Sequence, residues 1–163
     1  MIRLTTPLNR EKTKDLKKGD CVLLSGTIYT ARDAAHKKMA EEYEKTGSLP
    51  LCGEVIYYAG PCPKKAGEVI GSVGPTTSYR MDDYAELFCK NGCVYSIGKG
   101  NRDERAQRAI HDNNGVHFDA IGGAGAYYKS CVKSAEAVLY PELGAEAVYK
   151  LTVEDFPIIV RFL

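Results

Sequence analysis

The sequence predicts an α/β domain with a mixed sheet and flanking helices, and three observations lead to this class. Short apolar segments alternate with amphipathic segments along most of the chain, as in strands that are connected by helices. From residue 135 to the end, strand-like segments follow one another without a clear crossover helix, so part of the sheet should not be parallel. The length of 163 residues fits one domain that spans residues 1–163.

The expected strands are segments in which apolar residues alternate with polar ones or run continuously. The first is expected at an edge of the sheet, because Ile2 and Leu4 alternate with arginine and threonine, and the charged segment 10–20 after it should be a solvated loop. In chain order the expected strands are residues 1–10, 21–26, 51–60, 69–70, 93–97, 116–121, 135–140 and 156–162.

Four helices are expected between these strands. Thr30 is placed to cap the first, with Asp33 in the capping-box position three residues later. Ala35 and Met39 would face the core, and Gly47 suits the left-handed conformation that ends many helices. The other expected helices cover residues 82–90, residues 102–110, and a segment after the glycine-rich turn 122–126 that continues through Tyr128 and Val132.

The composition excludes several classes of function. Lys and Arg number 22 against 21 Asp and Glu, for a net charge of +1, which argues against a surface dedicated to nucleic acid or to an anionic membrane. No apolar segment approaches the roughly 20 residues of a transmembrane helix, and residues 1–8 lack the layout of a signal peptide. We therefore expect a cytoplasmic protein without a nucleic-acid or membrane partner.

The cysteines do not form a metal-binding pattern. None of the six belongs to a C-x-x-C pair, and no histidine or cysteine cluster completes a ligand set around Cys89 and Cys93, which lie four residues apart. In a reducing compartment such cysteines are mostly small buried hydrophobic residues. The sequence therefore predicts no metal site within this chain.

Residues 71–83 are the strongest candidate for a binding segment. Gly74 is held extended by the proline that follows it, and Thr76 or Thr77 could cap a helix that continues through residue 83. If this turn is helical, Arg80 lies on the same face as Thr76, one turn later. A hydroxyl, a guanidinium and free backbone N–H groups at a helix start suit an anionic ligand.

Three further segments place polar groups at strand ends or helix starts. Arg32 is expected in the first turn of a helix, where a cation is unfavourable unless an anion binds beside it, and His36 lies one turn later on the same face. Lys99 lies between two glycines after a strand, and Gly122 opens a glycine-rich turn. Ligands of α/β folds bind where strand carboxyl ends meet helix starts, and three cations over one pocket suit a small dicarboxylate.

Two alternatives to a dicarboxylate enzyme follow from the same residues. A nucleotide-binding domain is disfavoured, because the segment around Lys99 lacks the Walker spacing and the turn at Gly122 lacks the continuation of a dinucleotide fingerprint. A module that binds a dicarboxylate or another anion without catalysis remains open. The spacing of the residues does not decide between this module and an enzyme.

A family resemblance covers essentially the whole chain. The sequence resembles the β subunit, or C-terminal domain, of the class I fumarase and L(+)-tartrate dehydratase family of iron–sulfur hydro-lyases. The segments that carry the resemblance occur in the family's order: Leu24-Ser25-Gly26 with Ala31-Arg32-Asp33-Ala34-Ala35-His36, Gly74-Pro75-Thr76-Thr77 with Arg80-Met81-Asp82, Gly98-Lys99-Gly100-Asn101, Ile121-Gly122-Gly123-Ala124, and Val153-Glu154-Asp155-Phe156-Pro157.

The resemblance implies a fold of the swivelling β/β/α type and a reversible hydration or dehydration of a dicarboxylic 2-hydroxy acid. Fumarate and L-malate are favoured over L(+)-tartrate as substrates. The resemblance also implies a 4Fe-4S cluster whose cysteine ligands belong to an α subunit. The chain would then need that partner, in an assembly that contains either a homodimer of this chain or two copies of each subunit.

The resemblance also implies roles for individual residues. Thr76 matches the residue proposed as the catalytic base, and the cationic substrate ligands match Arg32, Arg80 and Lys99. The backbone at two glycines would also contact the substrate, and three further residues are secondary candidates. These five are Gly26 and Gly74, and then His36, Asp82 and Gly122.

Overall fold

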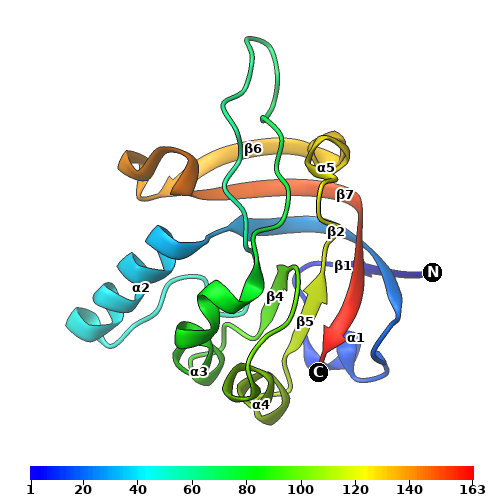
Figure 1. Cartoon of the computed structure of the whole chain (residues 1–163), viewed down its shortest axis with the longest axis vertical. Coiled ribbons are helices and arrows are strands. Elements are labelled where there is room, and N and C mark those ends of the chain that lie inside the picture. Colours follow the sequence, from blue (N-terminus) through cyan, green and yellow to red (C-terminus); the bar gives the residue numbers. More distant parts are fainter.

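A seven-stranded mixed sheet is the framework of the computed structural model, which describes residues 1–163 (Figure 1). The strands are β1 (Ile2–Thr5), β2 (Cys21–Thr30), β3 (Val55–Tyr57), β4 (Tyr95–Gly98), β5 (Val116–Asp119), β6 (Val132–Leu139) and β7 (Val148–Phe162). The helices are α1 (Arg10–Thr13), α2 (Asp33–Thr46), α3 (Asp82–Lys90), α4 (Glu104–Asp112) and α5 (Gly125–Cys131), with short 3-10 helices η1 (Ser78–Met81) and η2 (Pro141–Glu146).

The strand order is β1-β2-β3-β4-β5-β7-β6, with β2 also paired to β7. The first five strands are parallel to their neighbours, whereas β7 is antiparallel to β2, β5 and β6. Because β7 pairs with β2 and also with β5, the strands β2, β3, β4, β5 and β7 close into a ring. The expected mixed sheet is confirmed, and the antiparallel part is the tail, as the missing crossover helices predicted.

The helices flank this sheet on two sides. In Figure 1, α2, α3 and α4 lie below the long strands β2 and β7, and α5 lies near the start of β6. Met39 of α2 and Phe88 of α3 are buried against Ile56 of β3 in one apolar cluster. A larger cluster of 23 buried residues, including Tyr57 and Phe156, fills the space enclosed by the strands. None of the helices combines the length and the hydrophobicity that crossing a membrane requires.

Several local predictions are confirmed and others are corrected. Helix α3 has the predicted bounds, and Gly47 ends α2 with a φ of 71°. The strand expected at 51–60 is restricted to β3, because Leu51 and Gly53 both have positive φ values in a turn, and residues 69–70 form no strand. Strand β2 does not end at Gly26. That glycine has a φ of 109° at an irregularity in the pairing with β7, and the strand continues to Thr30.

Thr30 does not cap α2, contrary to the prediction. It is the last residue of β2, and its hydroxyl oxygen accepts a hydrogen bond from the backbone N–H of Tyr149 in β7 at 3.1 Å. The N-cap is Arg32, which makes no side-chain cap, and the helix begins at Asp33. The threonine side chain is unavailable for capping because it completes the contact between two strands.

Candidate functional site

The carboxyl ends of β2, β3, β4 and β5 meet at one edge of the sheet. The register pairs Thr30 with Tyr57, Tyr57 with Ile97, and Gly98 with Asp119. The next residues along the chain are therefore neighbours at this edge. They include Arg32 after β2, Lys99 after β4 and Gly122 after β5, so three of the predicted site segments come together here.

The segment that contains Thr76 crosses this edge between the extensions of β3 and β4. The Thr76 N–H donates to the Tyr58 carbonyl at 2.6 Å, and the Ser78 N–H donates to the Lys99 carbonyl at 2.8 Å. Thr77 and Lys99 form an isolated parallel bridge. Thr76 is therefore extended and buried, and the helical turn starts only at Ser78. The prediction that Thr76 and Arg80 share one helical face is wrong, because the backbone of Thr76 makes strand-like hydrogen bonds.

Close backbone contacts bring two glycines to the same edge. The N–H of Val73 donates to the Gly125 carbonyl at 3.2 Å, and a Cβ on Gly74 would lie 3.4 Å from the Cα of Gly125. A Cβ on Gly122 would lie 3.8 Å from Nζ of Lys99. The turn before α5 therefore borders both the Thr76 segment and the Lys99 ammonium.

Carboxylates of this chain hold both arginines of the site. The Nε group of Arg80 donates to Oδ2 of Asp33 at 3.0 Å, and Nη2 donates to the same oxygen. Nε of Arg32 lies 3.4 Å from Oε1 of Glu146, and that oxygen also accepts the N–H of Ala34 at 3.2 Å. The anion expected beside Arg32 at the start of α2 is therefore Glu146, a residue that lies 112 positions from Ala34.

Gly60 makes room for the Arg32 guanidinium. A Cβ at this position would lie 2.7 Å from Cζ of Arg32 and 2.9 Å from the Ala145 carbonyl, too close for either group to stay in place. Gly60 follows β3, so the guanidinium lies over the same strand edge as the Thr76 segment. Neither Gly60 nor Glu146 was expected from the sequence to border the site.

Gly26 lies elsewhere, in the middle of β2. A Cβ there would clash with the Thr6 hydroxyl and lie 3.2 Å from the Thr6 backbone nitrogen. Its positive φ is a conformation that glycine adopts without steric cost. The structure thus gives Gly26 a role in the close approach of the β1 end to β2, and we leave it out of the proposed site.

His36 is a fully buried core residue. Its ring stacks on Phe88 with 4.7 Å between centroids, and Nδ1–H donates to the Arg32 carbonyl at 2.9 Å. Burial lowers the pKa of His36 to about 4, although its hydrogen bond to Arg32 opposes that effect. A neutral ring enclosed by aromatic side chains supports the start of α2 rather than facing a ligand.

Lowering the pH from about 7.5 to about 5 is expected to destabilise the chain through this histidine. The folded state keeps His36 neutral down to about pH 4, whereas the unfolded chain takes up a proton near the ordinary pKa of 6.5. The stabilisation is therefore complete above pH 6.5 and is lost as the pH falls toward 4, by up to ~3 kcal/mol. Urea unfolding across this range measures it, and His36→Gln should show a weaker pH dependence. An unfolding free energy that stays constant from pH 7.5 to 5 would contradict this prediction.

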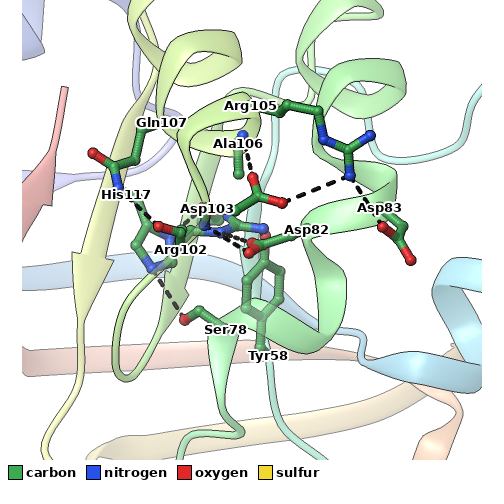
Figure 2. Close-up of polar contacts among 11 residues, drawn as sticks. Tyr58, Ser78, Asp82, Asp83, Arg102, Asp103, Arg105, Ala106, Gln107 and His117 are labelled. Carbon is green, nitrogen blue, oxygen red and sulfur yellow. Dashed lines mark hydrogen bonds and ion pairs between the residues drawn. The ribbon is translucent and has the colours of Figure 1, made fainter.

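Asp82 belongs to a buried polar network rather than to the open edge. Its Oδ1 accepts from Nε of Arg102 at 2.7 Å, and its Oδ2 accepts the N–H of Asp103 at 2.8 Å. Nη1 of Arg102 donates to the Tyr58 hydroxyl at 2.9 Å. Figure 2 shows Asp82, Arg102 and Tyr58 pointing toward one another, so the network connects the starts of α3 and α4 to the residue after β3.

A second buried group anchors the segment that follows Thr76. The two ring nitrogens of His117 lie 3.1 Å from Oγ of Ser78 and 2.7 Å from Oγ of Ser96. Burial, and then the charges of Arg102 and Arg161, hold the His117 pKa well below its usual value. Figure 2 shows Ser78 directed at the His117 ring. Sequence reasoning missed these residues, because their partners lie on separate elements.

The thiols of this chain do not fit an iron–sulfur cluster. Burial raises the pKa of Cys89 to about 11 and also raises the pKa of Cys93 and Cys131, which favours the protonated thiol over the thiolate that binds metal. The other three cysteines are exposed. No cluster of three or more histidine, cysteine or acidic side chains suited to a metal ion forms in the structure.

Comparison with known proteins finds one family model and several relatives that match this chain. The family described as Fumarase C-terminus matches residues 1–162. The chain is 43% identical over 138 residues to the anaerobic class I fumarate hydratase of Escherichia coli, and 40% identical over 152 residues to fumarate hydratase 2 of Leishmania major. It is 42% identical over 161 residues to a Methanocaldococcus jannaschii protein provisionally named L(+)-tartrate dehydratase subunit beta.

The matches differ in how much of the relative they cover. They include 82% and 91% of this chain but only 25% and 27% of the two fumarate hydratases. The match to the M. jannaschii protein includes 94% of this chain and 83% of that relative. The chain thus corresponds to about a quarter of the fumarate hydratases and to most of the protein named as a subunit.

Proposed function

The chain belongs to the fumarase C-terminus family, and on this premise we propose that it is the β subunit of an iron–sulfur hydro-lyase. The proposed reaction is the reversible hydration of fumarate to L-malate, with residues 1–163 acting as one catalytic domain. The observation that carries the proposal is the strand edge at which the backbone of buried Thr76 bonds to Tyr58 and the backbone of Thr77 bridges to Lys99. Arg32 lies at the same edge beside Gly60, and Arg80 lies there with its guanidinium hydrogen-bonded to Asp33.

The proposed chemistry assigns the proton transfer to Thr76. Dehydration of L-malate removes a proton from the carbon next to one carboxylate and hydroxide from the neighbouring carbon. The Thr76 oxygen would accept the proton, and the partner's cluster would supply a Lewis acid for the departing hydroxide. Nearby cations would lower the pKa of the Thr76 hydroxyl and so favour the ionised form. Negative charge that develops on the substrate carboxylate would be stabilised by Arg32, Arg80 and Lys99, while the backbone at Gly74 and Gly122 would leave space for the substrate.

The cluster that the family implies would belong to a partner chain. The raised pKa of the three buried thiols, those of Cys89, Cys93 and Cys131, supports that assignment. The name of the M. jannaschii relative, which describes it as one subunit of an enzyme, also supports it. We propose a cluster-bearing α subunit whose surface completes the site at the strand edge. The assembly would contain a homodimer of this chain or two copies of each subunit.

An L(+)-tartrate dehydratase is the second candidate, because the M. jannaschii protein covers nearly the whole chain. A third candidate, from another class, is a module that binds dicarboxylates without catalysis. Titration calorimetry of the isolated chain with fumarate, L-malate and L-tartrate separates this module from an enzyme subunit. The subunit should bind all three weakly and convert none, whereas tight binding without a partner would favour the module.

Replacing Arg80 by alanine is expected to raise the KM of the assembled enzyme for L-malate. The loss of one charge-assisted hydrogen bond to a substrate carboxylate corresponds to roughly 10- to 100-fold in affinity. Steady-state kinetics measures the effect, and Arg105→Ala serves as the matched control, because Arg105 pairs with exposed Asp83 on α3. A KM within twofold of the original would remove Arg80 from the substrate site.

A further inference from the structure

The Asp33 carboxylate makes side-chain hydrogen bonds to Arg80 and to no other residue. Nε and Nη2 of Arg80 both donate to Oδ2 of Asp33. Nη1 of Arg80 makes no hydrogen bond to the chain, so the pair leaves one nitrogen of the guanidinium available to a ligand. Oδ1 of Asp33 is shielded from solvent and has no partner. The contact therefore fixes one side of Arg80 and leaves the other side open.

Asp33 is not the residue that caps α2. An acidic residue in the first turn of a helix is commonly explained by the helix dipole or by bonds to the free N–H groups. Here the Ala34 N–H donates to Glu146 instead, and the N-cap residue Arg32 makes no side-chain cap. The position of the Asp33 side chain is therefore set by Arg80, which is 47 residues away in the sequence.

The ion pair between Arg80 and Asp33 is too exposed to contribute much to the stability of the fold. The side chains of Arg80 and Asp33 are 46% and 40% exposed, and a pair this accessible to water contributes little to folding. Its effect on the conformation of Arg80 is larger, because a free arginine side chain samples many rotamers. A carboxylate that binds two of the three guanidinium nitrogens restricts those rotamers before any ligand arrives.

The pair also connects two parts of the proposed site. Asp33 directly follows Arg32, whereas Arg80 is in η1, close behind Thr76. The hydrogen bonds between Asp33 and Arg80 therefore fix the position of Arg80 relative to Arg32, the residue directly before Asp33. Fixing the groups that contact a substrate lowers the entropic cost of reaching the reactive geometry.

We propose that Asp33 is a positioning residue that holds the Arg80 guanidinium ready for the substrate carboxylate. This role rests on the proposed function, since it assigns Arg80 to substrate binding. A positioning role predicts that removing Asp33 weakens substrate binding without unfolding the chain. A purely structural role predicts a loss of stability with unchanged kinetics of the folded enzyme.

The first measurement uses the isolated chain and does not depend on activity. The exchange rate of the Arg80 Nε–H proton with water is measured by nitrogen-15 NMR, with the signal assigned from Arg80→Lys. Asp33→Ala should speed this exchange about tenfold or more, because the proton loses its acceptor. Glu41→Ala, which removes an exposed acid from the same helix, should leave it unchanged. Equal exchange rates in Asp33→Ala and the unaltered chain would overturn the proposal.

The second measurement uses the chain assembled with its cluster-bearing partner. Asp33→Ala should raise the KM for L-malate about tenfold with a smaller effect on kcat, and Asp33→Glu should restore part of the loss. The effect should vanish when Arg80 is already alanine, because the two residues act as one unit. Additive effects, or a normal KM in Asp33→Ala, would overturn the positioning role. If the unaltered assembly converts no dicarboxylate, the proposed function fails, and the exchange measurement still decides whether Asp33 orders Arg80.

Discussion

Replacing Thr76 by alanine is expected to lower the kcat of the assembled enzyme by about 10²- to 10⁴-fold, the usual contribution of a positioned acid–base group. The KM should change little, because the hydroxyl acts on a proton that moves only in the transition state. The Thr76 backbone is fixed by its hydrogen bond to Tyr58 at 2.6 Å, so the substitution should not displace the segment. Steady-state kinetics with L-malate and fumarate gives both constants.

Two variants control this prediction. Thr76→Ser keeps a hydroxyl at the same backbone position and should retain much of the activity. Thr77→Ala removes the neighbouring hydroxyl while the bridge between Thr77 and Lys99, which involves only the backbone, remains possible. It should have a far smaller effect than Thr76→Ala. If Thr76→Ala kept near-normal turnover, or if the two alanine variants behaved alike, Thr76 would not be the base.

Replacing Arg102 by alanine is expected to lower the free energy of unfolding of the isolated chain by about 3–5 kcal/mol, as for other broken buried ion pairs. The side chains of Arg102 and Asp82 are only 2% and 6% exposed. Removing the arginine leaves the Asp82 carboxylate buried without its charge partner and leaves the Tyr58 hydroxyl without its donor. Urea unfolding followed by circular dichroism measures the loss.

The chain contains a matched control three residues away along the sequence. Arg105 pairs with Asp83, and these two residues lie close in sequence to Arg102 and Asp82. The side chains of Arg105 and Asp83 are 57% and 88% exposed. Arg105→Ala should therefore change stability little, because water solvates both charges in either state. Equal losses in Arg102→Ala and Arg105→Ala would show that burial of the pair does not matter.

The parts of the fold that follow from local signals were predictable from sequence. Helix α3 has an amphipathic pattern that its own residues determine, and its bounds agree with the prediction. Gly47 ends α2 because glycine adopts the left-handed conformation without a Cβ clash. The antiparallel tail followed from the absence of crossover segments. The two helix features depend on residues within a few positions of one another, and the tail depends on the short segments between consecutive strands.

The features that sequence reasoning missed depend on distant partners. Nothing near Arg32 in the sequence indicates that Glu146 will lie beside it, and the same holds for Arg80 and Asp33. The segment that contains Thr76 was predicted with the wrong local structure, because hydrogen bonds to the backbone of Tyr58 and Lys99 give it strand-like pairing. Tertiary hydrogen bonds here override the helix start that the local residues favour.

The polar candidates fall into two groups according to their surroundings in the fold. His36 and Asp82 are buried among partners of this chain, and their substitution should act mainly on stability. Arg32, Thr76, Arg80 and Lys99 come to one strand edge, and their substitution should act mainly on the reaction. Residue type alone did not distinguish the groups, because the partners that surround His36 and Asp82 lie on other elements of the chain.

An anaerobic assay of this chain mixed with the proposed cluster-bearing partner chain tests the hydro-lyase function most directly. Fumarate has an ultraviolet absorbance that is lost when it is hydrated to L-malate, so one trace reports the reaction. We expect turnover by the mixture, none by either chain alone, and turnover slower by about 10²-fold or more when the mixture contains Thr76→Ala at comparable concentration. Full hydratase activity of this chain alone, or a mixture with an intact cluster that converts neither fumarate nor L-tartrate, would contradict the proposed function.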